Sequence, residues 1–119
     1  VMVGHLRFNA WDDAPTSISR VAVRVLRKEL DFRGVIVTDD LGMGALANID
    51  PLTVLDRATD AGMDLFLYTM PPLQWDKLVD HVVRRIKRGE ASEARNTASV
   101  RRILRGKIAH FELGFEDLN

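Results

Sequence analysis

The chain has 119 residues, room for one domain of ordinary size, and its lack of cysteine excludes disulfide scaffolds, thiol catalysis and cysteine-based zinc sites. Hydrophobic residues make up 46% and charged residues 29%, which excludes disordered and fibrous proteins and predicts a packed core. Lys plus Arg and Asp plus Glu each number 17, so the formal net charge is zero and we expect neither nucleic acid nor an anionic membrane as the main partner.

The first third of the chain predicts a strand, a loop and a helix. Residues 1–3 are apolar and indicate the end of a buried strand. Because natural domains seldom begin within a strand, this start suggests a piece of a longer protein. An irregular loop over 6–16 precedes a helix from Ser17 to about residue 30, whose apolar side chains recur at i, i+3, i+4 and i+7. Thr16 or Ser17 can cap the free N–H groups of this helix.

The middle of the chain predicts a second strand–helix unit. Residues 35–38 are β-branched throughout, as expected of a strand buried on both faces, and a glycine-rich loop follows at 41–45. Asp50 and Pro51 are typical of a helix start, because the carboxylate caps the first turn and proline fits within it. Gly62 is placed to end that helix.

The last part predicts a third strand and two helices. Residues 65–68 indicate another buried strand, which 70–72, with two prolines, would stop. Apolar residues over 75–86 form the most regular helical stripe, and basic residues suited to a helix C-terminus follow it. A final helix is predicted over 92–110. Its inward-facing side chains are predicted to be Val100, Ile103, Leu104 and Ile108.

Three consecutive strand–helix units followed by a terminal helix predict an α/β fold with parallel strands and right-handed crossovers. Three strands cannot close a barrel. The chain is therefore predicted to form either a small open sheet or one side of an eight-stranded TIM-like barrel whose other strands lie upstream.

Two adjacent carboxylates stand where such folds bind ligands, at the carboxyl end of a strand. Asp39 and Asp40 directly follow the second strand. Because side chains alternate along an extended segment, these carboxylates should point in different directions, one toward a pocket and the other bracing the loop. The simpler interpretation is that both are turn and cap residues, for which aspartate is a favoured type.

Other candidates lie at the same end of the predicted sheet. His5 follows the first strand and either lines the pocket or is a satisfied histidine at a strand end. Met43 either lines the same pocket or fills the core. Phe8 and Trp11 could stack on a sugar ring or cover the end of a neighbouring strand. His81 lies off the apolar stripe of its helix and is predicted to be a solvated surface residue.

Residues 34–43, GVIVTDDLGM, resemble the nucleophile segment of glycoside hydrolase family 3. In that family a glycine precedes an apolar strand that ends in Ser or Thr, and the catalytic aspartate follows. A second aspartate and then Leu-x-Met are the form seen in the β-N-acetylglucosaminidase branch. Supporting similarities are the strand at 1–5, LRKELDFRG at 26–34 and AGMD at 61–64, so that the resemblance extends over about residues 1–70.

The resemblance implies a retaining β-N-acetylhexosaminidase on a TIM-like barrel, which releases terminal β-linked N-acetylglucosamine from peptidoglycan- or chitin-derived glycans. Asp39 matches the nucleophile that forms a glycosyl-enzyme, and Asp40 matches a neighbour that braces the loop or holds the nucleophile. His5 and Met43 would line the sugar subsite. Thr38 and the backbone N–H groups of the glycine-rich turn are candidates to keep the pKa of the nucleophile low. No metal or cofactor is implied.

The sequence also departs from the family pattern. The general acid of that branch, a His–Asp pair on a mobile loop, and its sugar-holding Lys-His-Phe-Pro-Gly segment are absent here and belong to earlier strands. Residues 1–119 are therefore expected to be a single partial catalytic domain, the last three or so units of the barrel, inactive alone on natural substrate. The branch acts in bacterial cell-wall recycling, commonly in the cytoplasm. The chain shows no signal segment and no apolar run of the roughly 18 residues that a membrane span needs.

Two alternatives stay open. A receiver-like module that binds Mg²⁺ and accepts a phosphoryl group needs an acidic pair after its first strand, an acceptor aspartate after a central strand and a lysine after a later one. Here the acidic pair follows the second strand, and 69–71 stand at the acceptor position. The other alternative is a non-catalytic half-barrel whose exposed sheet edges self-associate or pair with the missing half.

Overall fold

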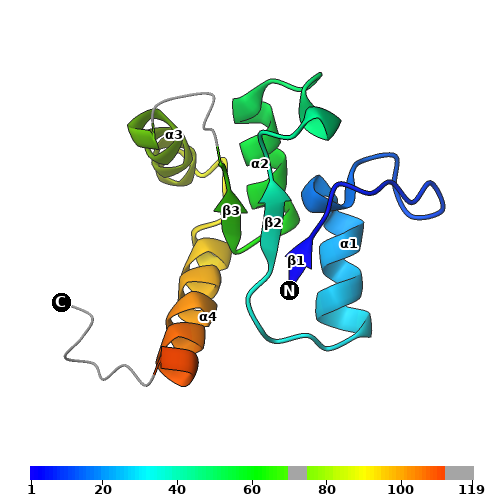
Figure 1. The fold of residues 1–119 in the computed structure, drawn as a ribbon. Helices are drawn as coiled ribbons and strands as arrows, with labels where there is room; N and C mark the ends of the chain where they lie inside the picture. Colours follow the sequence, from blue (N-terminus) through cyan, green and yellow to red (C-terminus); the bar gives the residue numbers. More distant parts are fainter. Residues whose placement is uncertain (70–74, 112–119) are drawn as a thin grey trace.

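The computed structural model of the chain describes residues 1–69 and 75–111. Its three strands form one parallel sheet in the order β1-β2-β3, which confirms the predicted α/β fold with parallel strands (Figure 1). The strands are β1 (Met2–Val3), β2 (Val37–Asp40) and β3 (Leu65–Leu67). The α-helices are α1 (Arg20–Arg24), α2 (Pro51–Ala61), α3 (Trp75–Lys87) and α4 (Glu93–Phe111). Three short helical segments complete the fold, η1 (Thr16–Ile18), the π-helical η2 (Val25–Glu29) and η3 (Gly44–Leu46).

The core lies between the sheet and the first two α-helices. Ile36, directly before β2, is fully buried and belongs to one apolar cluster with residues of α2 such as Val54 and Ala58. Thr38, in the middle of β2, is also fully buried. β2 is the central strand, so both of its edges are paired and the residues that follow it are held in place from two sides.

The helix predicted from Ser17 to about residue 30 is divided, and its cap differs from the prediction. Ser19 has an extended backbone (φ −100°, ψ 126°), and its Oγ accepts hydrogen bonds from the N–H groups of Val21 and Ala22. Ser19 is therefore the cap of α1. Thr16 and Ser17 belong to η1 instead, because their hydroxyl groups bond to residues 4–6, directly after β1.

The second helix agrees with the prediction at both ends. Oδ2 of Asp50 accepts the N–H of Thr53 at 3.0 Å, and Pro51 is the first residue of α2. Gly62 ends the helix in the left-handed region at φ 98°. β3 includes 65–67 of the predicted strand, and the predicted stop at 70–72 lies outside the described residues.

α3 packs on α2 through charged side chains as well as apolar ones. The prediction for His81 is wrong, because its Nε2 lies 2.7 Å from Oδ1 of Asp56 and the side chain is half-buried. Arg85, one turn further along α3, lies 3.1 Å from both Asp56 and Asp60. His81, which was predicted to be solvated, therefore takes part in the polar contact between α3 and α2.

The prediction for the inward face of α4 is wrong in part. Ile103 and Ile108 are half-buried, but Val100 and Leu104 are exposed, Val100 by 45%. The reason is that Arg102 contacts the carboxylate before β3, so a polar contact sets the rotation of the helix. α4 extends away from the N-terminal end of β3 (Figure 1). None of the helices in the described part of the chain is long and apolar enough to cross a membrane.

Candidate active site

The carboxyl end of β2 presents Asp39 and Asp40 between the ends of the two neighbouring strands. One oxygen of Asp39, Oδ1, accepts the N–H of Asp40 at 2.8 Å. The other, Oδ2, lies beside Gly4 after β1, at 4.0 Å from where a Cβ on that glycine would stand. The Asp39 side chain is half-buried, and no hydrogen bond to Oδ2 is found among the described residues. One oxygen is thus fixed by the main chain while the other is available.

Asp40 faces the opposite neighbour, β3. Its Oδ1 accepts the N–H groups of Gly42 at 2.9 Å and Thr69 at 3.3 Å, and its Oδ2 accepts the hydroxyl of Thr69. The hydroxyl of Thr69, followed by the N–H of Gly42, holds the pKa of Asp40 below its usual range. The Asp40 carboxylate therefore ties the glycine-rich loop to the residue that follows β3.

The donors predicted to act on Asp39 have other partners. The hydroxyl of Thr38 accepts the N–H of Leu67 at 3.1 Å, because Thr38 is buried and, by strand alternation, lies on the opposite face of β2 from Asp39. In the glycine-rich turn, the N–H of Gly42 bonds to Asp40. The hydrogen bond that Asp39 does receive comes from its own neighbour in the strand.

His5 lies at the same end of the sheet, but both of its ring nitrogens are hydrogen-bonded to other protein atoms. Nδ1 is 2.6 Å from Oγ of Ser17, and Nε2 is 2.8 Å from the carbonyl oxygen of Asp40. Ser17 is fully buried in η1. The structure thus brings His5 next to the aspartate pair while leaving neither nitrogen available to a sugar hydroxyl as long as these bonds exist.

The three remaining candidates, Met43, Phe8 and Trp11, are each nearly half exposed. Met43, at the start of η3, is 46% exposed. Phe8 and Trp11 stack on each other in the loop after β1, with ring centroids 5.2 Å apart, and each is nearly half exposed. All three side chains are therefore accessible to a ligand. In the described part of the chain, no group of three or more histidine, aspartate or glutamate side chains could hold a metal ion.

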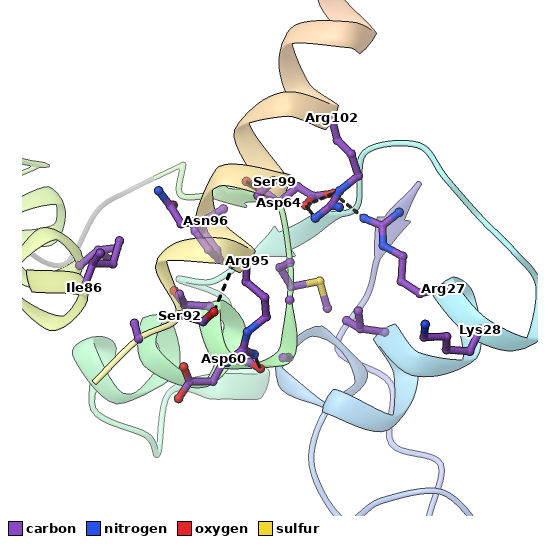
Figure 2. A pocket seen from close by; sticks show the side chains of 18 residues that line it. Arg27, Lys28, Asp60, Asp64, Ile86, Ser92, Arg95, Asn96, Ser99 and Arg102 are labelled. Atoms are coloured by element: carbon purple, nitrogen blue, oxygen red, sulfur yellow. Dashed lines mark hydrogen bonds and ion pairs between the residues drawn. The ribbon is translucent and has the colours of Figure 1, made fainter. Parts of the chain in front are cut away.

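One cavity lies at the opposite end of the sheet. It has a volume of about 410 Å³ and is lined by residues around the start of β3, the end of α2 and the first half of α4 (Figure 2). Neither this cavity nor a smaller one of about 230 Å³ near Arg20 and Arg57 is lined by Asp39, His5 or Met43. Within the described residues, the aspartate pair thus lies outside both cavities.

A buried ion-pair cluster at this cavity was missed by the sequence analysis. Asp64, whose side chain is fully buried, pairs with Arg27 at 2.6 Å and with Arg102 at 2.8 Å, and it also accepts the N–H of Ile36 (Figure 2). Burial alone raises the pKa of Asp64, but the hydrogen bonds from Arg102 and Ile36 outweigh it and the pKa is lowered. The signal in the sequence is a charged residue directly before an apolar strand.

The comparisons with known proteins point to one family. The family described as "Glycosyl hydrolase family 3 N terminal domain" matches residues 1–106. A beta-hexosaminidase of Hydrogenovibrio crunogenus is 36% identical over 84 residues, which are 69% of this chain and 24% of that protein. A beta-hexosaminidase of Histophilus somni is 32% identical over 110 residues, which are 91% of this chain and 30% of that protein. The chain thus spans less than a third of the length of these curated relatives.

Solved structures agree with this match. A glycoside hydrolase family 3 beta-N-acetylglucosaminidase from Paenibacillus sp. superposes with a TM-score of 0.82 at 30% identity, covering 96% of this chain and 23% of that one. The beta-N-acetylglucosaminidase from Thermotoga maritima superposes with a TM-score of 0.77 at 22% identity, which shows the shared fold alone, covering 88% of this chain and 24% of that one.

Proposed function

The chain belongs to glycosyl hydrolase family 3, and we propose that it supplies the nucleophile, Asp39, of a retaining β-N-acetylhexosaminidase. The observation that carries the proposal is the arrangement of the aspartate pair. Asp39 has one oxygen held by the N–H of Asp40 and the other without a hydrogen bond among the described residues, at the end of a parallel strand where such folds bind ligands. The family match does not favour the receiver-like alternative.

The proposed reaction has two displacements at the anomeric carbon. In the first, Oδ2 of Asp39 forms an ester bond to that carbon while the bond to the leaving oxygen breaks, and a general acid outside this chain gives the leaving oxygen its proton. In the second, water attacks the same carbon, the ester bond breaks, and the water proton returns to the same group. The ester oxygen leaves as the Asp39 carboxylate, so that charge and atoms balance over the cycle.

The remaining site residues take supporting roles in this proposal. Asp40 braces the loop through Gly42 and Thr69, and the exposed side chain of Met43 lines the sugar subsite. Phe8 and Trp11 offer exposed aromatic rings to the C–H face of a sugar ring. The substrate that we propose is a glycan with terminal β-linked N-acetylglucosamine, derived from peptidoglycan or chitin, which a bacterium would degrade in the cytoplasm during cell-wall recycling.

We further propose that residues 1–119 act as the last three or so units of a larger barrel. Supporting this, the sheet of the described residues has three parallel strands and two unpaired edges, and the relatives are more than three times as long as the matched part. The general acid would come from the rest of that barrel, so the chain alone is expected to leave natural glycans uncleaved.

A covalent labelling experiment tests the nucleophile without the general acid. A fluorinated N-acetylglucosaminyl fluoride loses fluoride without protonation, so the carbon–fluorine bond breaks as the ester to Asp39 forms. We expect intact-mass spectrometry to show one adduct, mapped to Asp39 and absent in Asp39→Asn. Asp13→Asn, a change at an exposed aspartate in the loop after β1, is the matched control and should still be labelled. A folded chain that gains no adduct, or gains it elsewhere, would contradict the assignment of Asp39.

A further inference from the structure

The ring of His5 has one defined hydrogen-bonding state in this fold. A carbonyl oxygen only accepts hydrogen bonds, so the contact of Nε2 with the carbonyl of Asp40 requires the proton to be on Nε2. In the neutral ring Nδ1 then accepts, and its partner at 2.6 Å, the hydroxyl of Ser17, donates. Ser17 is fully buried, so its hydroxyl has few other ways to satisfy its hydrogen bonds.

The carbonyl that His5 holds belongs to the residue that also holds Asp39. Asp40 donates its N–H to Oδ1 of Asp39, and its carbonyl oxygen accepts both Nε2 of His5 and the N–H of Met43 at 3.0 Å. The two peptide groups on either side of the Asp40 Cα are therefore fixed, one by the Asp39 carboxylate and the other by the histidine. The two groups meet at the Cα of Asp40, so bonds that hold the second group also restrain that Cα and leave the first group less room to shift.

We propose that His5, oriented by Ser17, is a positioning residue for Asp39, acting through the main chain of Asp40 rather than by contact with the sugar. The proposal rests on the proposed function of Asp39. It links three elements, since Ser17 lies in η1, His5 follows β1 and Asp40 ends β2. Nucleophilic attack depends on a reacting atom held close to its line of approach, so a bond that restrains the adjoining peptide contributes to the rate of attack.

Three variants separate positioning from contact with the sugar. His5→Phe keeps a ring but removes both nitrogens, and His5→Gln keeps an N–H donor that reaches the same region. Ser17→Ala removes the group that orients the ring. His81→Gln is the matched control, because it changes a half-buried histidine whose partner, Asp56, belongs to the contact between α2 and α3 and is not bonded to any residue of this site.

The first measurement is the rate of Asp39 labelling by the fluorinated N-acetylglucosaminyl fluoride at increasing concentrations. We expect His5→Phe to lower the maximal rate about tenfold or more while the half-saturating concentration stays near that of the unchanged chain. His5→Gln should recover part of the rate, and His81→Gln should have no effect. Equal maximal rates in His5→Phe and the unchanged chain would overturn the positioning role, and so would a change confined to half-saturation, which would indicate sugar contact.

The second measurement needs no sugar, so failure of the inference can be told from failure of the proposed function. We expect nitrogen-15 NMR of the neutral His5 ring to show a protonated Nε2 and an unprotonated Nδ1, and Ser17→Ala to weaken that preference. Hydrogen exchange at the Asp40 amide should become faster in His5→Phe and less so in His5→Gln. Unchanged exchange, or the opposite tautomer, would overturn the inference even if Asp39 were never labelled, whereas an unlabelled chain with the expected exchange would contradict the nucleophile alone.

Discussion

At the scale of single residues, the chemistry of the site depends on the different hydrogen bonds that two neighbouring carboxylates accept. From the residues that the structure describes, the Asp39 carboxylate receives one hydrogen bond, from the main chain, while that of Asp40 receives three, from Gly42 and Thr69. Strand alternation predicted that the two would diverge, and they do, toward β1 and β3 respectively. The sequence alone could not reveal the partner of Asp40, because Thr69 lies 29 residues away and reaches it only once β3 is paired.

The first prediction concerns Thr69→Val. Removing the hydroxyl removes the largest cause of the low pKa of Asp40, so that pKa should rise toward its ordinary value. At pH values above the unfolded pKa of about 3.9, the depressed pKa of Asp40 stabilises the fold. This contribution is lost as the pH falls through the folded pKa. Carbon-13 NMR titration of the carboxyl group measures the shift. Thr59→Val, which removes a hydroxyl bonded within α2, should leave the Asp40 titration unchanged.

The second prediction compares two glycines. A Cβ at Gly4 would stand in ordinary contact with Asp39, and its φ is not in the left-handed region, so Gly4→Ala should stabilise the fold by about 0.4–1 kcal/mol through the unfolded chain. Gly62 has φ 98°, so Gly62→Ala should destabilise it by about 1–2 kcal/mol. Urea unfolding of the two variants measures both values. A loss of stability in Gly4→Ala would mean that the space between Gly4 and Asp39 is smaller than this structure shows.

At the scale of elements, the sequence predicts well those helices and strands whose signals are local. The proline of α2 is its first residue, its cap and its terminal glycine directly adjoin it, and the helix has the predicted bounds. The helix from Ser17 was mispredicted because two hydroxyl groups that could have capped it bond across the fold instead, to His5 and to the backbone of Gly4. The rotation of α4 depends on a partner of Arg102 that is 38 residues away, which periodicity does not record.

The third prediction concerns Asp64→Asn, which removes the charge that joins α4 and η2 to the start of β3. Arg27 and Arg102 would then lose their shared partner in a buried place, and we expect a loss of about 3 kcal/mol in the free energy of unfolding. Asp31→Asn is the control, since its ion pair with Arg33 is exposed and should contribute less than about 1 kcal/mol. Urea unfolding followed by circular dichroism measures both.

The Asp64 carboxylate also makes the stabilising contribution of its ion pairs with Arg27 and Arg102 depend on pH. The pKa of Asp64 is lowered in the fold, so its stabilising contribution is complete above the unfolded value of about 3.9 and is lost as the pH falls through the folded value. The unchanged chain should therefore lose stability more steeply below about pH 4 than Asp64→Asn does. Parallel acid unfolding curves for the two would contradict the role of the cluster.

At the scale of the whole molecule, one face of the sheet lacks a covering layer among the described residues. Met2, Val37 and Leu65 are aligned in register across the three strands, on the face opposite to buried Ile36. Met2 is 56% exposed and Leu65 is 43% exposed. β1 and β3 are both edge strands, and their free N–H and C=O groups can pair with further strands. An apolar row next to open edges is a surface suited to association.

The last prediction follows from this face. As its concentration is raised, the isolated chain should sediment as species heavier than its 13.4 kDa monomer, because burying the row Met2–Val37–Leu65 against a second copy removes apolar area from water. Placing lysine at the two exposed positions, Met2→Lys with Leu65→Lys, should return the chain to a monomer without unfolding it. Leu30→Lys, at a more exposed apolar residue outside the sheet, should not. A wild-type chain that stays monomeric at every concentration would show that this face needs no cover, and the inference that the sheet is one side of a larger barrel would lose its physical support.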